Sequence, residues 1–179
     1  MEVVMKRSFG MWQLFGFAIV SLSGTLLHFL YEWSGRSVWL APFSGVNEST
    51  WEHMKLLFWP MLIYAVIEGF FFKEYDNFHF TKLKGISLGL IMIPILFYTY
   101  NGVIGRSPDR VNIAIFFISA AVAFIYETRS LEESSMYLVR PVSVSLLVII
   151  ALLFVVFTFK PPALNIFKDP ITSSYGITT

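Results

Sequence analysis

The sequence contains no cysteine, and charged side chains are scarce in it. Without cysteine the chain forms no disulfide, offers no thiolate to a metal and has no cysteine nucleophile. Only 14% of its 179 residues are charged, whereas a soluble domain of this length carries roughly a quarter. The formal net charge of +1 at pH 7 is too small to attract nucleic acid, so we expect no nucleic-acid partner.

Apolar residues make up 56% of the chain, which is too much for the interior of a water-soluble globule of this size. The few charges fall in short clusters separated by long apolar runs. A run of about 20 apolar residues crosses about 30 Å of hydrocarbon when it forms an α-helix. The composition therefore predicts an integral membrane protein that is surrounded by membrane lipid.

Five runs of this kind lie at about residues 9–31, 54–72, 86–102, 111–126 and 142–159. They are continuous and not alternating, which favours helices over barrel strands, because a helix satisfies its own backbone hydrogen bonds in lipid. Two prolines at 161 and 162 end the last run. We therefore expect an all-α fold, an integral membrane helical bundle of about five transmembrane helices. This single domain covers residues 1–160, and 161–179 form a C-terminal tail.

The distribution of Lys and Arg predicts the orientation of the five spans, because cytoplasmic loops carry an excess of these residues. The side of the N-terminus and of the second and fourth loops holds Lys6, Arg7, Lys73, Lys82, Lys84, Arg129 and Arg140. The opposite side holds Arg36, Arg106, Arg110, Lys160 and Lys168, with Lys55 at the head of a helix. We expect a multi-pass protein of the cell membrane with its N-terminus in the cytoplasm.

Polar residues crowd where the first run ends and the second begins, in the segments 28–33 and 46–53. These segments hold two of the three histidines and three of the twelve acidic residues. Charges beside hydrocarbon are costly and often mark a functional site. His28 and Glu32 share a helix face, as do Glu48 and Glu52 if the second helix begins near Asn47. Two antiparallel helices then direct one imidazole and three carboxylates toward a common point.

Such a group suits either a divalent metal or acid/base chemistry, since histidine supplies nitrogen ligands, glutamate supplies oxygen ligands and both transfer protons. The candidate metal ligands are His28, Glu32, Glu48 and Glu52. The candidate catalytic residues are Glu48, Glu52 and His53. The candidate ligand-pocket residues are Tyr31, Asn47 and Trp51.

Helix-start chemistry is the alternative explanation of the same residues. Asn47, Ser49 or Thr50 can cap a helix, the glutamates suit the positive end of its dipole, and tryptophans gather at membrane interfaces. His28 has no such task, because it lies inside an apolar run. Three interpretations therefore stay open: helix capping, a proton-transfer or polar-ligand site, and a metal site.

Two residues within the apolar body of the second run are unusual for such a segment. Glu68 lies near its cytoplasmic end, where we expect its side chain to snorkel toward Lys73; a proton relay is the alternative. Pro60 cannot donate a helical hydrogen bond and so leaves the carbonyl of Leu56 without its partner. A kink is expected there.

Three classes of function fit these features. The first is a membrane-embedded hydrolase, metal-dependent or acid/base, that acts on a lipid-like substrate. The alternative is a transporter-like protein or a partner-binding membrane subunit without catalysis. A subunit of that kind would pack through its aromatic and small-residue faces, including Ser21, Gly24 and Ser143, against a second copy or another membrane protein. The chain has no nucleotide-binding loop, nucleophile elbow or HExxH zinc motif to decide among them.

The two motifs His28-Phe-x-Tyr31-x-Trp33 and Val46-Asn-Glu-Ser-x-Trp51-Glu-His53 resemble those of an uncharacterised family of small bacterial multi-pass membrane proteins. The resemblance is strongest over residues 20–60, and the chain length and hydrophobic profile agree with it. It implies a bacterial cytoplasmic membrane and adds no chemistry. It also directs attention to residues 28–53.

Overall fold

The computed structural model describes residues 2–72, 75–105, 108–133 and 139–177, with the side chains of 2–8 and 132–133 excluded. Its helices are α1 (Glu2–Trp33), α2 (Thr50–Phe72), α3 (Phe78–Ile104), α4 (Asp109–Glu133), α5 (Arg140–Phe159) and the short 3-10 helix η1 (Asn165–Phe167). Each long helix contains the apolar run predicted for it, and all five are long and apolar enough to cross a membrane. The prediction of an all-α fold with about five such helices is confirmed.

Turn-forming residues set several of the helix ends. Gly105 ends α3 in the left-handed conformation (φ +76°), and its N–H donates to the carbonyl of Asn101 over 2.8 Å. Pro141 lies in the first turn of α5, where its missing N–H costs no hydrogen bond. The same helix stops at Phe159, two residues before Pro161.

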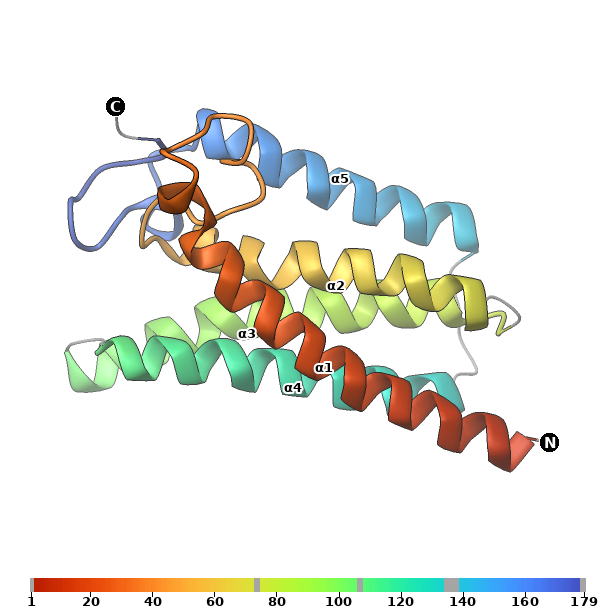
Figure 1. Cartoon of the computed structure of the whole chain (residues 1–179). Coiled ribbons are helices and arrows are strands. Elements are labelled where there is room, and N and C mark those ends of the chain that lie inside the picture. The colour runs from red at the N-terminus through yellow and green to blue at the C-terminus, as the bar shows by residue number, and fades with distance from the viewer. Residues whose placement is uncertain (1, 73–74, 106–107, 134–138, 178–179) are drawn as a thin grey trace.

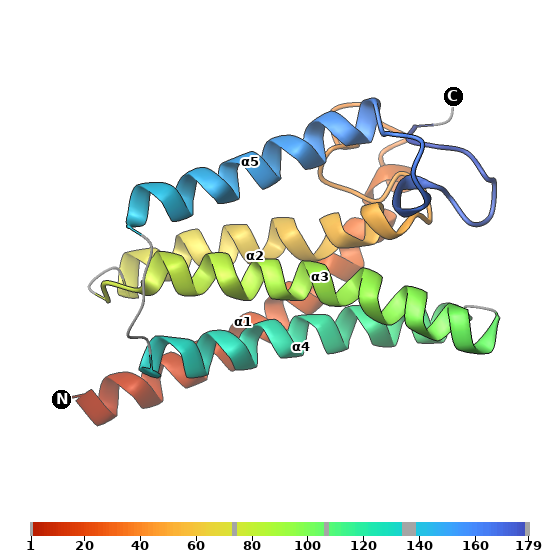
Figure 2. The ribbon, with the colours of Figure 1, turned by 180° about the vertical axis from the view of Figure 1, so that it is seen from behind.

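The helices form a bundle in which α1 crosses the others at an angle (Figure 1). It contacts α2 and α4, and α3 contacts α2 and α4 as well. Helix α5 lies on the other side of the bundle, against α3 and α2 (Figure 2). The two ends of the chain lie at opposite ends of the bundle, and the segment 34–49, here called the linker, lies at the C-terminal end (Figure 1).

The outward faces of the helices are apolar. Large side chains such as Leu14, Phe70 and Ile63 are more than half exposed, and α5 exposes Val148, Leu152 and others along most of its length. A soluble protein rarely carries so much contiguous apolar surface. This surface suits contact with lipid and supports a multi-pass membrane protein.

Small residues bring α1 close to its neighbours within the chain. A Cβ added at Gly24 would lie 2.7 Å from the carbonyl oxygen of Leu56 in α2 and 2.5 Å from the ring of Phe116 in α4. This carbonyl is the one that Pro60 leaves without a helical donor. Ser21 and Ser143 are also buried inside the bundle. The expectation that these small residues face another protein is therefore wrong, because the chain buries them itself.

A buried ion pair joins the linker, α2 and α5. The Lys55 ammonium lies 2.6 Å from the Glu52 carboxylate and donates to the carbonyl of Ala41 and to the Thr158 hydroxyl, over 2.9 and 2.8 Å. The Glu52 carboxylate accepts the N–H of Val46 over 2.9 Å. Lys55 is fully buried, and each of its three donors has a partner. The pair therefore fixes the linker against the helices.

The close approach at Gly24 predicts opposite effects for two Gly→Ala variants of α1. Gly24→Ala should destabilise the protein by about 1–3 kcal/mol, because the new methyl group overlaps the backbone of α2. Gly10→Ala should stabilise it by about 0.5–1 kcal/mol, because nothing lies within 4 Å of that position and alanine favours the helix. Denaturation in detergent, followed by circular dichroism, measures both. Equal effects would contradict the close approach.

The ion pairs Glu52–Lys55 and Glu32–Arg36, which both lie near the linker, provide a second comparison. Glu52→Ala leaves Lys55 buried without a counter-charge and should cost about 3–5 kcal/mol of stability. Glu32→Ala breaks the exposed pair with Arg36, whose atoms lie 3.1 Å apart, and should cost at most about 1 kcal/mol. The same denaturation experiment tests the difference, and a small loss for Glu52→Ala would show that the buried pair is dispensable.

Candidate functional site

The linker folds back over the end of α1. The Ser44 hydroxyl accepts the N–H of Tyr31 over 2.9 Å and donates to the carbonyl of Leu27. The Trp59 indole of α2 donates to the carbonyl of Pro42 over 2.8 Å. The Ser44 hydroxyl thus bonds to both members of an i, i−4 pair of α1, and these bonds bring the second half of the linker beside His28.

Asn47 shapes the turn that leads into α2. Its side-chain oxygen accepts the N–H of Ser49, and its amide nitrogen donates to the carbonyl of Gly176 in the C-terminal tail, both over 2.9 Å. Helix α2 then begins at Thr50 and not near Asn47. The expectation that Glu48 and Glu52 share a helix face is therefore wrong, since Glu48 precedes the helix.

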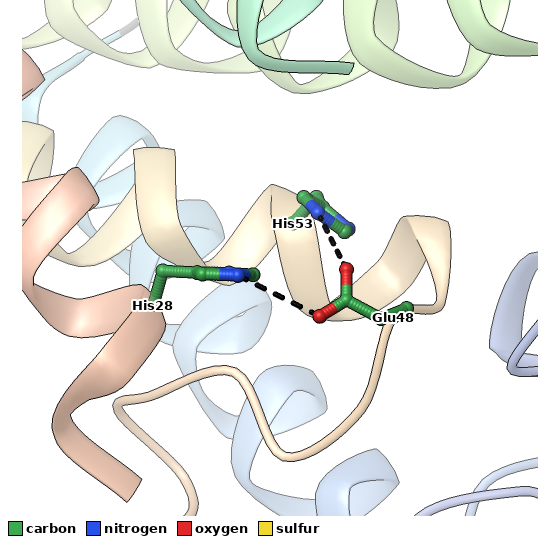
Figure 3. A group of neighbouring side chains, drawn as sticks. All are labelled: His28, Glu48 and His53. Carbon is green, nitrogen blue, oxygen red and sulfur yellow. Dashed lines mark ion pairs between the residues drawn. The ribbon is translucent and has the colours of Figure 1, made fainter. Parts of the chain in front are cut away.

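Three side chains from α1, the linker and α2 meet at this end of the bundle: His28, Glu48 and His53, here called the His/Glu triad. Figure 3 shows the Glu48 carboxylate between the two imidazole rings. One carboxylate oxygen lies 3.5 Å from Nε2 of His28, and the other lies 3.5 Å from Nε2 of His53. The triad can offer one ligand atom from each residue, all within 4.8 Å of one another.

The backbone fixes which nitrogen of His53 faces the centre of the triad. Nδ1 of this ring lies 2.9 Å from the carbonyl oxygen of Ser49. A carbonyl only accepts, so Nδ1 carries the hydrogen and the lone pair of the neutral ring is on Nε2, toward Glu48. Histidines that bind metals are oriented by a hydrogen bond of this type.

One hollow adjoins the triad at His53, and a second shares part of the wall of the first. The smaller, of about 20 Å³, is lined by His53, Thr50 and Asn112 together with apolar side chains of α3 and α4. That volume accommodates about one water molecule. The larger, of about 240 Å³, shares Thr50 with it and also has Lys168 and Asn165 in its wall. A small polar group can therefore lie beside His53.

The remaining predicted site residues lie elsewhere. Glu32 is exposed and pairs with Arg36, and Glu52 is buried against Lys55. Tyr31 is buried at the end of α1, beneath the linker. Trp51 stacks among Phe154, Phe157 and Phe167, where it holds the C-terminal tail against α2 and α5. Of the four predicted metal ligands, the structure thus brings together His28 and Glu48, and His53 joins them.

A second polar group, which sequence reasoning missed, lies inside the other half of the bundle. Lys82 of α3 forms ion pairs with Glu68 of α2 and Glu127 of α4, and Gln13 of α1 donates to Glu68. All four are buried, so Glu68 does not snorkel as expected, and Lys73 lies outside the described residues. Lys82 looked like a loop charge because the third helix begins at Phe78, well before its apolar run.

Comparison with known proteins identifies the family and nothing more specific. No curated protein and no solved structure matches the chain. A family match covers residues 1–177, almost the whole chain. The chain belongs to the family of unknown function DUF6512.

Proposed function

We propose that the chain is a membrane protein that binds one divalent transition metal through the His/Glu triad. The observation that carries this proposal is the position of one carboxylate between the Nε2 atoms of two histidines, 3.5 Å from each. Glu48 comes from the linker, and the two histidines come from different helices. Three donors from three segments at this spacing are not explained by helix capping.

The spacing suits a metal ion. Zinc lies about 2.0–2.2 Å from nitrogen and oxygen ligands, so that two ligands of a tetrahedral site are about 3.4 Å apart. Both histidine–glutamate separations are close to this value, each to a different oxygen of Glu48, and one ligand atom from each of the three residues lies within 4.8 Å of the others. The hydrogen bond from His53 to Ser49 supports the same role, because it keeps the lone pair of Nε2 directed at the metal position.

Two histidines and one glutamate leave a coordination position open, as in catalytic zinc sites and in non-haem iron sites. A metal ion held by His28, Glu48 and His53 would supply the Lewis acidity that makes a water molecule in that position a better nucleophile. The hollow beside His53 has room for such a water. We therefore infer hydrolysis of a lipid-like substrate at this membrane face as the reaction class.

We propose a cell-membrane location with the N-terminus in the cytoplasm and the triad at the external side. With Lys82 neutralised inside the bundle, the N-terminal side keeps six Lys and Arg residues against five on the other. Two of the six, Lys6 and Arg7, directly precede the apolar part of the first helix, which usually dominates orientation. The opposite ends of the bundle at which the two termini lie agree with five crossings (Figure 1).

The metal proposal predicts about one zinc, iron or manganese ion per chain in protein purified in detergent. His28→Ala, Glu48→Ala and His53→Ala should each weaken zinc binding by more than the roughly 10–100-fold that loss of an outer-shell contact costs. Asn47→Ala, which frees the Glu48 turn from the tail, should fall within that range. Elemental analysis and competition with a zinc chelator measure these effects.

Glu32→Gln is the matched control, because it removes a carboxylate from the same end of the bundle but outside the triad. Its metal content should equal that of the wild type. A folded wild type that binds no metal after incubation with zinc, iron or manganese salts would overturn the proposal and leave the triad as a metal-free polar group.

The orientation is testable because the chain has no native cysteine. Trp39→Cys lies in the linker at a position that is 88% exposed, and Asp76→Cys lies on an exposed residue between α2 and α3. In intact bacterial cells, a membrane-impermeant maleimide should label the first variant and should label the second only after permeabilisation. The reverse pattern would show that the N-terminus is external.

A further inference from the structure

The buried group in the N-terminal half of the bundle consists of Gln13, Glu68, Lys82 and Glu127, here called the Lys82 cluster. Each of its members comes from a different helix, α1 to α4 in order. None is more than 2% exposed. Glu68 lies fifteen residues after His53 in α2, about 22 Å along the helix. The cluster is therefore separate from the His/Glu triad.

The charges of the Lys82 cluster do not balance if both glutamates are ionised. Two carboxylates and one ammonium sum to −1, and all three groups are shielded from water. An uncompensated buried charge is so costly that the group usually takes up or loses a proton instead. The Glu52–Lys55 pair at the other end of α2 has no such imbalance, since one carboxylate meets one ammonium.

The hydrogen bonds show the same imbalance, because acceptors outnumber donors. Gln13 donates through its nitrogen to Glu68, whereas its own side-chain oxygen has no partner. One carboxylate oxygen of Glu127 is also buried without one. Gly85 provides the space for Glu127, since a Cβ at this position would overlap the carboxyl group. One additional hydrogen on a carboxyl group would supply a donor as well as neutrality.

We propose that the Lys82 cluster is a proton-binding site, in which Glu68 and Glu127 share one proton at neutral pH. Two carboxyl groups held by one ammonium titrate as a pair, and the first proton neutralises the whole cluster. The bound proton belongs to the pair and not to either residue alone. The ligand of this site is thus a proton.

The surroundings of the cluster supply no other counter-charge among the described side chains. The titratable and polar groups that face it are Gln13 from α1, Tyr64 and Glu68 from α2, Lys82 from α3 and Glu127 from α4. The Tyr64 hydroxyl donates to the backbone carbonyl of Trp12 over 2.7 Å and is already used. Phe9 and Phe78 cover the Lys82 ammonium from 5.6 and 5.7 Å.

Infrared difference spectroscopy tests this proposal, since a protonated carboxyl group has a carbonyl band that a carboxylate lacks. Wild-type protein in lipid nanodiscs at pH 7 should show this band at an intensity of one carboxyl per chain. Glu68→Gln and Glu127→Gln should each abolish it, because the remaining glutamate then pairs one-to-one with Lys82. Glu32→Gln, which removes an exposed carboxylate, is the matched control and should leave the band unchanged.

A wild type without the band at pH 7 overturns the proposal, whether both glutamates are then ionised or a metal cation balances them. A band that persists in both Gln variants overturns it too, because the proton would then lie elsewhere. If a Gln variant does not fold, Glu68→Asp and Glu127→Asp keep the carboxyl group and should shift the frequency of the band. These results do not depend on metal binding at the His/Glu triad, so the two proposals can fail separately.

Discussion

Lipid offers neither a counter-ion nor a hydrogen-bond partner, and this constraint explains how the chain places its internal charges. Lys55 and Lys82 are both buried, and each is held by glutamate side chains of the same chain. The first ties the linker and α5 to α2, and the second ties α2, α3 and α4 together. Water cannot replace an ion pair inside the bilayer. Each pair therefore fixes the relative positions of segments that apolar packing alone would hold less specifically.

The helices were predictable because each depends only on a local property, the continuity of an apolar run. The ends of the helices were less predictable. Helix α3 begins before its apolar run, so that Lys82, four residues after its first residue, lies in the helix and not in a loop. The concentration of polar residues near the end of α1 was also predictable from the sequence. The prediction that Glu48 shares a helix face with Glu52 was wrong. The turn at Asn47 places Glu48 before the helix, and this turn is bonded to Gly176 in the tail, which is far away in sequence.

The Lys82 cluster could not be derived from spacing. Its ion pairs join residues from three helices, and no pattern along one helix reveals which charges face each other. The available signal was compositional: a glutamate within an apolar run requires a partner, but Lys73, Lys82 and Lys84 all lie near the same end of the predicted runs. The Glu52–Lys55 pair, three residues apart on one helix, was in contrast within reach of sequence reasoning.

The role of Glu52 in that pair determines which ligands are available to the proposed metal site. Turning its carboxylate toward a metal would leave Lys55 buried without a counter-charge, which is more costly than one ligand bond can easily offset. The triad is therefore left with two neutral imidazoles and one carboxylate, so that a divalent ion bound there would retain one positive charge. A cationic metal centre beside an apolar bundle favours hydroxide or an anionic substrate group in the open position. Lys168, in the wall of the larger hollow, adds a second positive charge at the same end of the bundle.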